Sequence, residues 1–359
     1  MPFLDRPPEA ADSVDPHLTA RPTLRDIAEE IGVSIMSVSR ALRNQPKVSA
    51  ATARRIRQVA RRLGYAPEPA LSALVAQRER RRFGGAYGTI AVLFNWREPE
   101  QWMQVPSGVL TIRGVERQAR TLGYQTENFS LKSKGMSGKR LSEILYHRGI
   151  RGVIVAPNEW PGDPIDLNWR EFSVVTIEHE PTLPHFHHIS PNYYSAVIEA
   201  WSQACKRGYR RIGFVTANRE IRRVEHHWLA AFLLEQNRRP TEGGNVPPLL
   251  MPDYSDPARF ADWYREHRPD VVLSRADREI CTWLSHLGRR VPQDVGFLSL
   301  NVALKDSSGI VQNREKMGRI AVDVLHTKML HFERGPDDAL CGTVVENTWQ
   351  EGRTLRRKG

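Results

Sequence analysis

The sequence of 359 residues is poor in cysteine and has no long apolar run. Cys205, Cys281 and Cys341 lie far apart and form no C-x-x-C pair, which argues against a disulfide framework and a zinc ribbon. We expect all three to be small, buried apolar residues. Nowhere do 18 apolar residues follow one another, so no transmembrane helix is expected. The N-terminus has no basic segment followed by an apolar stretch, so we expect no signal peptide and a cytoplasmic protein.

Motifs that carry catalysis are also missing. The segment 135–138 matches a nucleophile elbow only in part, and no phosphate-binding glycine loop follows a strand. The histidine groups at 185–188 and 226–227 lack the cysteine or acid spacing of a metal site, which favours neutral surface histidines. We therefore expect a protein that is not an enzyme and that has no cofactor and no metal.

The net charge of +11 is distributed unevenly. Residues 1–20 carry a net charge of −3, several prolines and no apolar periodicity, so a disordered tail is expected there. Residues 21–85 carry +9. A small, strongly basic module is typical of a protein that binds the phosphate backbone of a nucleic acid, although a solvated basic face is the alternative.

Three short amphipathic helices are predicted within this basic module. The first follows Thr23, which can form a capping box with Asp26, and it ends at Gly32. The second follows Ser34, so the two helices must meet at a sharp turn. A third helix after Ser49 completes a small core. The pattern predicts an all-α helix-turn-helix DNA-binding domain over residues 21–67.

Residues 68–87 are expected to form a hinge helix and a linker. Pro69 suits the first position of a short helix, and the basic run from Arg78 to Arg82 is followed by two glycines. A helix of this length is marginal by itself, so it is expected to become ordered against DNA or a second copy of itself.

From residue 88 to the C-terminus, short β-branched runs alternate with longer amphipathic stretches. This alternation predicts an α/β domain with parallel, doubly wound sheets, and its length suggests two lobes with a cleft between them. The expected strands are 89–94, 152–156, 174–177, 211–215, 270–273 and 295–300. The expected helices are 109–122, 141–147, 193–206, 226–236, 260–267, 279–287 and 315–332.

Several segments resemble the LacI/GalR family of bacterial repressors. They are the runs at 23–34, 37–42 and 63–67 of the basic module, and the runs at 206–215, 291–297 and 317–322 of the larger part. The resemblance implies a dimeric DNA-binding regulator with a two-lobe effector domain like that of periplasmic sugar-binding proteins, over residues 88–359. It also implies a palindromic operator in double-stranded DNA, because two-fold pairing follows from the hinge helices.

The resemblance implies which residues contact DNA: Thr23, Ser34, Ile35, Met36, Ser37, Ser39, Arg40, Asn44, Lys47 and Leu74. The family reads bases through the positions of Ile35, Met36 and Arg40. Two apolar side chains favour contact with thymine methyl groups, with core packing under the turn as the alternative. Arg40 would bind a guanine or a phosphate, unless its role is structural.

Other members of this set would position the protein rather than read sequence. Ser34, Ser39, Asn44 and Lys47 are candidates for phosphate contacts, and each could instead be a cap or a surface polar group. Leu74 matches the residue with which the family wedges open a base step in the minor groove. Ordinary helix-helix packing is the alternative for Leu74.

Candidate effector residues follow the expected strands, because ligands of such folds bind at the carboxyl ends of strands. They are Asn95, Trp96, Arg97, Asn158, Trp160, Arg223, Arg275, Asp277 and Asn301, with Glu159 beside them. Aromatic faces and planar polar groups are typical of a sugar site. The chain lacks the glycine that the family places after the arginine matched by Arg223, which suggests a ligand unlike the best-known ones.

The sequence therefore predicts a transcriptional regulator, most simply a repressor, that binds its operator as a homodimer under control of a small molecule. A transport-type binding protein would need a secretion signal and no helix-turn-helix. The remaining alternative is a cytoplasmic small-molecule-binding protein of the same fold with only non-specific DNA affinity.

Overall fold

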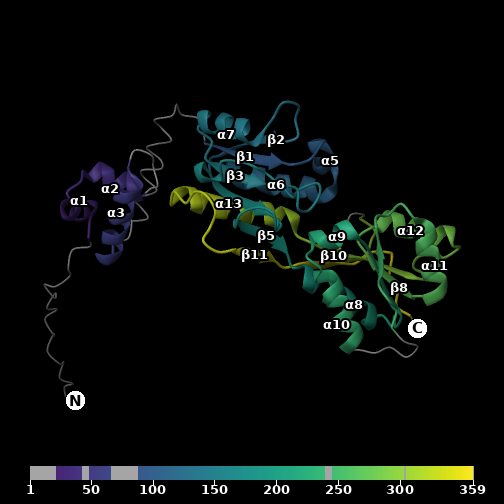
Figure 1. Ribbon diagram of the computed structural model, residues 1–359. Helices are drawn as coiled ribbons and strands as arrows, with labels where there is room; N and C mark the ends of the chain where they lie inside the picture. The colour runs from purple at the N-terminus through teal and green to yellow at the C-terminus, as the bar shows by residue number, and fades with distance from the viewer. Residues whose placement is uncertain (1–21, 43–47, 66–87, 239–244, 303–304, 359) are drawn as a thin grey trace, which may run out of the picture. The chain divides into compact units, whose positions relative to one another are not determined.

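The structure is a computed structural model that describes residues 22–42, 48–65, 88–238, 245–302 and 305–358 (Figure 1). The chain divides into two compact units, one up to Val75 and one from Ala76 onward. The expected tail, the hinge segment 68–87 and the candidates Asn44, Lys47 and Leu74 lie outside the described residues. Among the helices that are described, none has the length and apolar character needed to cross a membrane.

The first unit is a bundle of three helices: α1 (Leu24–Ile31), α2 (Ile35–Leu42) and α3 (Ala50–Arg62). The predicted caps are confirmed, because the Thr23 and Asp26 side chains form a capping box and Ser34 Oγ accepts a hydrogen bond from the Ser37 amide. Gly32 ends α1 with φ 72°, a backbone conformation that glycine adopts without strain. The helices bury a common apolar core that includes Ile27, Val38 and Ile56.

The second unit contains two lobes, each built on a six-stranded sheet. The first sheet is parallel throughout, in the order β11-β5-β4-β3-β1-β2. Its strands are β1 (Thr89–Phe94), β2 (Gln125–Ser130), β3 (Gly152–Val155), β4 (Ser173–Ile177), β5 (His187–Pro191) and β11 (Gly342–Val345). Its helices are α5 (Pro99–Gln104), α6 (Pro106–Thr121), α7 (Gly138–His147) and α13 (Arg314–Leu330).

The second lobe has the strand order β12-β10-β9-β8-β6-β7, with only β12 antiparallel to its neighbour. Its strands are β6 (Ile212–Ala217), β7 (Leu249–Met251), β8 (Val271–Ser274), β9 (Gly296–Ser299), β10 (Gly309–Val311) and β12 (Thr348–Gln350). Its helices are α8 (Tyr193–Lys206), α9 (Asn218–Arg223), α10 (His227–Arg238), α11 (Pro257–His267) and α12 (Asp277–His286). The predicted two-lobe fold with doubly wound sheets is thereby confirmed.

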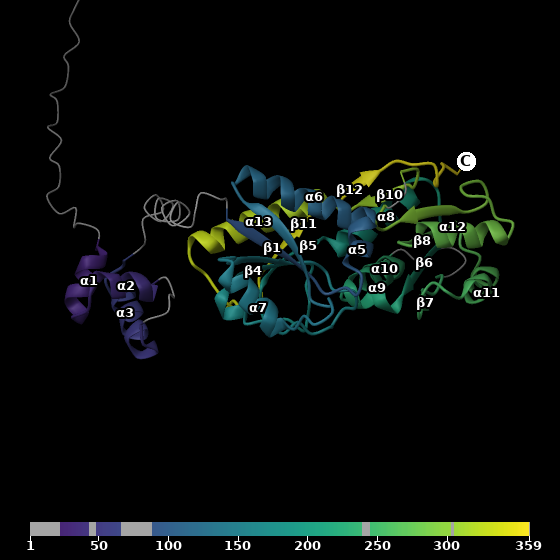
Figure 2. The same ribbon diagram turned by 90° about the horizontal axis from the view of Figure 1, so that it is seen from above.

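Helices α6 and α13 lie against each other in the first lobe, although they are far apart in sequence (Figures 1 and 2). Glycines make this close approach possible. A Cβ atom on Gly114 would lie 2.0 Å from the Glu315 carbonyl oxygen, and one on Gly318 would lie 2.2 Å from the Thr111 carbonyl oxygen. The end of the chain thus supplies a helix to the lobe that begins at β1.

The chain passes between the lobes three times, after β5, after β10 and after β11. Side chains connect these passages: Asn192 donates to Glu346 Oε1 at 2.8 Å, and Asn313 donates to the Glu346 carbonyl at 2.7 Å. Asn347 donates to the Asn192 carbonyl at 2.6 Å. The connection between the lobes is therefore one hydrogen-bonded cluster rather than three independent segments of the chain.

Two expectations about single residue types are wrong in part. Cys205 and Cys281 are half-buried, and burial raises the pKa of Cys281 to about 12, but Cys341 is exposed because it precedes the edge strand β11. His187 and His188 are not surface residues: they lie half-buried in β5, and desolvation lowers the pKa of both.

Candidate DNA-reading helix and effector cleft

Helix α2 separates its core side chains from its outward side chains. Val38 and Ala41 are buried, whereas the side chains of Ile35 and Met36 are 49% and 59% exposed. The alternative that these two residues pack in the core is therefore wrong. Exposing two neighbouring large apolar side chains at the start of a helix has no benefit for the isolated bundle, so they are available to contact another molecule.

The other candidates on this helix have mixed surroundings. Arg40 lies in the last turn of α2 and is half-buried, as are Ser37 and Ser39. Thr23 and Ser34 serve as helix caps, so their side-chain oxygens already accept backbone hydrogen bonds. The Thr23 hydroxyl also donates to Asp26 Oδ2 at 2.9 Å, and the Ser34 hydroxyl lies 2.9 Å from Ser37 Oγ, so a phosphate contact would have to replace these hydrogen bonds.

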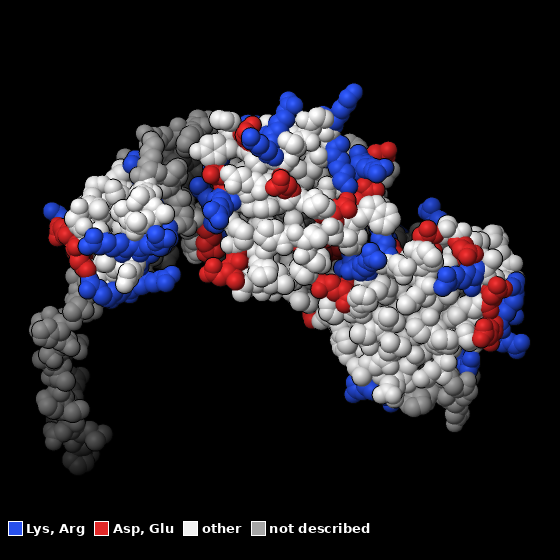
Figure 3. Space-filling view, viewed as in Figure 1, with Lys and Arg blue, Asp and Glu red and all other residues white. Residues whose placement is uncertain are grey.

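Basic side chains gather on the same three-helix unit. The exposed arginines Arg54, Arg55, Arg61 and Arg62 come from α3, and Figure 3 shows arginine side chains on the visible face of the unit. Arg62 contacts Glu30 of α1, so part of this charge is compensated within the unit. The rest is of the sign that attracts a phosphate backbone.

In the second unit, the predicted effector residues follow the carboxyl ends of strands in both lobes. Asn95, Trp96 and Arg97 follow β1, and Asn158 and Trp160 follow β3. Arg223 ends α9, Arg275 and Asp277 follow β8, and Asn301 follows β9. Hydrogen bonds between side chains of the two lobes show which of these residues the fold brings together.

The residues after β1 and β3 support one another. Trp96 Nε1 donates to the Pro157 carbonyl at 2.7 Å, and the Arg97 amide donates to Glu159 Oε2 at 3.0 Å. Asn158 is almost completely buried and donates to the Asp163 carbonyl at 2.9 Å. The side chain of Arg97 points into solvent.

Arg223 reaches from the second lobe to this wall of the first lobe. Its Nη2 donates to the carbonyl oxygens of Asn158 and Glu159 at 2.7 and 3.2 Å, and its Nη1 lies 3.5 Å from Glu178 Oε2. The missing glycine therefore does not keep Arg223 away from the cleft.

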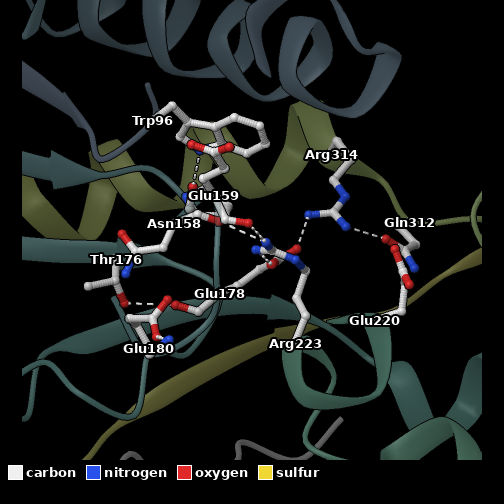
Figure 4. A network of polar contacts seen from close by, with 12 residues as sticks. Trp96, Asn158, Glu159, Thr176, Glu178, Glu180, Glu220, Arg223, Gln312 and Arg314 are labelled. Atoms are coloured by element: carbon white, nitrogen blue, oxygen red, sulfur yellow. Dashed lines mark hydrogen bonds and ion pairs between the residues drawn. The ribbon is translucent and has the colours of Figure 1, made fainter. Parts of the chain in front are cut away.

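Glu178 lies at the centre of the interlobe contacts and was not predicted from the sequence (Figure 4). It follows β4, is 4% exposed and has φ 65°. Arg314, the first residue of α13, donates to its Oε1 at 2.6 Å and also contacts Gln312. Burial raises the pKa of Glu178, but Arg314 and Arg223 outweigh burial and hold that pKa below its usual value. Glu178 is therefore a buried carboxylate in its charged form.

The wall of the second lobe carries its own polar pairs. Ser299 Oγ donates to Asp277 Oδ1 at 2.6 Å, and Arg275 Nη1 donates to Glu220 Oε1 at 2.6 Å. The backbone amide of Asn301 donates to Ser299 Oγ at 3.4 Å. The side chain of Arg275 is 43% exposed, so it remains accessible to solvent.

A second arginine of α9 lies against aromatic rings of the first lobe. The guanidinium carbon of Arg219 is 4.8 Å from the ring centroid of Trp160 and 5.7 Å from that of Trp96. Desolvation lowers the pKa of Arg219, helped by the charge of Arg223. Arg219 and Glu220 were also missed in the sequence, because α9 is only six residues long and has no clear periodicity.

Buried polar atoms without a hydrogen-bond partner concentrate in this region of the described structure. They include Asn95 Nδ2, Asn158 Oδ1, Thr216 Oγ1, Glu220 Oε2 and Arg314 Nε. A small pocket in the same unit has Glu178, His179, Glu180 and Arg223 in its lining. Buried polar atoms are ordinarily satisfied, so the unsatisfied atoms mark a place for a ligand or for ordered water.

Both parts of the chain match known families. Residues 23–68 match the bacterial regulatory proteins of the lacI family, and residues 202–354 match the periplasmic binding protein-like domain. The HTH-type transcriptional repressor CytR of Escherichia coli (strain K12) is 27% identical over 334 residues, which are 86% of this chain and 89% of CytR. The sucrose operon repressor of Shigella flexneri is also 27% identical, but the match spans 53% of this chain and about half, 54%, of that protein.

Solved structures agree with the fold. A complex of the transcriptional regulator CelR with cellobiose superposes with a TM-score of 0.59 at 20% identity, covering 93% of this chain and 100% of that one. The lac repressor dimer bound to operator and the anti-inducer ONPF gives 0.55 at 14% identity, covering 94% and 100%. The relatives are regulators, in agreement with the expectation that the chain is not an enzyme. The chain therefore carries a DNA-binding domain of the lacI family of bacterial regulatory proteins at residues 23–68 and a periplasmic binding protein-like domain at residues 202–354.

Proposed function

We propose that this protein is a cytoplasmic transcriptional repressor that binds a palindromic operator as a homodimer and responds to a small molecule in the interlobe cleft. Helix α2 would lie in the major groove, where each base pair presents a distinct pattern of chemical groups. Ile35 and Met36 would contact thymine methyl groups, and Arg40 would bind a guanine or a phosphate.

The observation that carries the DNA-binding part is the exposure of Ile35 and Met36 on a helix whose opposite face is buried. Both side chains are free of the core, so they can be used for recognition without disturbing the fold. The arginines of α3 add charge that lowers the free energy of binding to any DNA, whereas the two apolar residues offer a means of discrimination.

The effector part rests on the unsatisfied polar atoms between the lobes. Asn95, Asn158 and Glu220 offer a buried amide nitrogen, an amide oxygen and a carboxylate oxygen, which suit the hydroxyl groups of a sugar or sugar derivative. A sugar ligand is also named for the CelR complex. Trp96 and Trp160 add the aromatic faces against which a sugar ring can stack.

The contacts between the lobes suggest how the signal is transmitted. Arg223 belongs to the second lobe and Glu178 to the first, so any ligand that replaces their contact changes the relative stability of two lobe arrangements. A ligand shifts such an equilibrium only by its differential affinity for the two states. The lobe movement would then alter operator affinity through residues 68–87.

Selection of bound sequences from random duplex DNA tests the proposal, with the full-length protein at physiological salt. We expect recovery of one palindrome, and light scattering should show a dimer. If no sequence is enriched, with or without added sugars, the protein is instead a small-molecule-binding protein with only non-specific DNA affinity. Tight binding of a monomer to a single half-site would contradict the paired hinge helices.

A further inference from the structure

We propose that the first-lobe wall of the cleft is a binding site for an organic cation, a guanidinium or amine group, and that Arg219 and Arg223 of α9 occupy this site in the structure. The inference deepens the proposed effector function and rests on the same cleft. Within the proposed class of sugar derivatives, its consequence is that the effector carries a positive charge, as an amino sugar does, and competes with α9.

The aromatic half of the site is formed by Trp96 and Trp160. Both indole rings have the guanidinium of Arg219 within 6 Å of their centroids, the distance at which a cation is attracted to the face of an aromatic ring. The hydrogen bond from Trp96 to the Pro157 carbonyl fixes one ring. Trp160 is 53% exposed although Arg219 lies over it, so the slot opens to solvent and a ligand can enter.

The polar half of the site offers hydrogen-bond acceptors to Arg223. Its guanidinium meets the carbonyl oxygens of Asn158 and Glu159 and the carboxylate of Glu178. Carbonyl and carboxylate oxygens can only accept hydrogen bonds, and a guanidinium or ammonium can only donate them. An anionic ligand placed at the position of the Arg223 guanidinium would meet these three acceptors.

The charge of this wall has the corresponding sign. When α9 is left out of account, the first lobe contributes the carboxylates Glu159, Glu178 and Glu180, and the two arginines Arg97 and Arg314. Arg314 is committed to Glu178 and Gln312. His179 is engaged with Glu225 at 2.7 Å. The wall therefore keeps a net negative charge for which Arg219 and Arg223 are the partners.

Helix α9 is suited to leave this wall. Arg219 and Arg223 are four residues apart, so they lie on the same face of a six-residue helix and enter the two halves of the site together. The turn after α9 contains Glu225 and His226 at φ 47° and 62°, a conformation that costs non-glycine residues free energy. Burial also lowers the pKa of Arg219, which shows that its charge is held at a cost.

Chemical rescue tests the site without knowledge of the natural effector. In full-length protein, Arg219→Ala removes the guanidinium from the indole slot, and ethylguanidinium is then added at constant ionic strength. We expect a saturable rise in Tm of about 2 °C, the size that a bound ligand at a moderate excess over its Kd produces in a domain of this length. Ethylurea has a similar shape without charge and should give no rise. Arg223→Ala should be rescued in the same way.

Two controls make the result decisive. Arg278→Ala removes an exposed arginine of α12 and should show no rescue. Adding Trp160→Ala to Arg219→Ala should abolish rescue, while the double variant keeps its cooperative unfolding. Equal rises with ethylurea, or in the Arg278 variant, would overturn the proposal, and so would no rise in a folded Arg219 variant. Because the readout needs no DNA, it is independent of whether the operator selection succeeds.

Discussion

The carboxylate of Glu178 lies between two arginines that come from opposite sides of the cleft. Arg314 donates to one oxygen at 2.6 Å, and Arg223 lies 3.5 Å from the other. The side chains of Glu178 and Arg314 are only 5% and 10% exposed. Their mutual neutralisation is therefore a condition for burying either of them.

Replacing Glu178 by Gln should destabilise the second unit strongly. The change keeps the side-chain shape but leaves Arg314 buried without its counter-charge, which costs about 3–5 kcal/mol. Urea denaturation of both proteins measures the difference in the free energy of unfolding. Glu127→Gln is the matched control, because Glu127 pairs with Arg148 at 2.6 Å on the surface and should cost only about 0–1 kcal/mol. Equal losses would contradict a special role for the buried pair.

The contribution of Glu178 should depend on pH with a defined sign. The two arginines hold its pKa below the ordinary glutamate value of 4.5 in the folded protein. Its stabilising effect is then fully present above that value and is lost as the pH falls through the lower, folded-state pKa. The stability difference between the original protein and Glu178→Gln should shrink as the pH is lowered below about 4.5. A stability difference that increases as the pH is lowered would mean that Glu178 is buried as the neutral acid.

Met36 should recognise thymine by contacting the methyl group of the base. Met36→Ala should leave the free energy of unfolding within about 0.5 kcal/mol, because the side chain is exposed. Affinity for the selected operator should fall by about 1 kcal/mol, the value of one buried methyl contact. Replacing the contacted thymine by deoxyuridine should weaken the original protein and not the variant. Equal sensitivity of both proteins to deoxyuridine would place Met36 elsewhere.

Replacing Arg40 shows whether this residue recognises a base or binds a phosphate. Arg40→Ala should cost about 1–3 kcal/mol on the selected operator and relax the preference at one base position. Titrations on operator and random duplexes at two salt concentrations measure both effects. The same loss on both duplexes, with a shallower salt dependence, would instead identify a phosphate contact.

Leu74 should act as a wedge in the minor groove. Leu74→Ala should reduce the bend that the protein induces in operator DNA, because the unstacked base step closes when the apolar side chain is removed. A gel assay with circularly permuted operator fragments measures the bend. An unchanged bend angle would favour the alternative that Leu74 packs between hinge helices.

The contact between α6 and α13 should not tolerate a methyl group. Gly318→Ala would place a Cβ atom 2.2 Å from the Thr111 carbonyl oxygen, which is backbone and cannot rotate away. We expect a loss of about 1–3 kcal/mol or more in thermal or urea unfolding. Arg319→Ala, at the next and exposed position, should change stability by less than about 0.5 kcal/mol. Two equal responses would mean that the helices separate freely.

The elements that sequence predicts well are those whose signals are local. Thr23, Ser34 and Gly32 define the turns of the three-helix unit through contacts within a few residues. The structure contains each of these predicted caps. The six predicted strands are apolar and buried in the sheets. Strands β2 and β11 were missed because edge strands are partly exposed and need no continuous apolar run.

Only some residues of the cleft can be predicted from the sequence, because others are brought together only by the fold. Asn158 and Asp277 could be placed because each lies three residues after the end of a strand. Glu178 also follows a strand, β4, and could have been found by extending that rule to every predicted strand. Its pairing with Arg314 could not, because 136 residues separate the two and the fold alone brings them together.

The three passages between the lobes also determine when the protein can become complete during synthesis. The first lobe begins at β1 but receives α13 and β11 only after most of the second lobe has been made. On the ribosome, its early strands must wait with uncovered apolar surface until residue 345 has emerged. Neither lobe can therefore be expressed as a continuous fragment of the chain, and a truncation before β11 leaves both lobes unfinished.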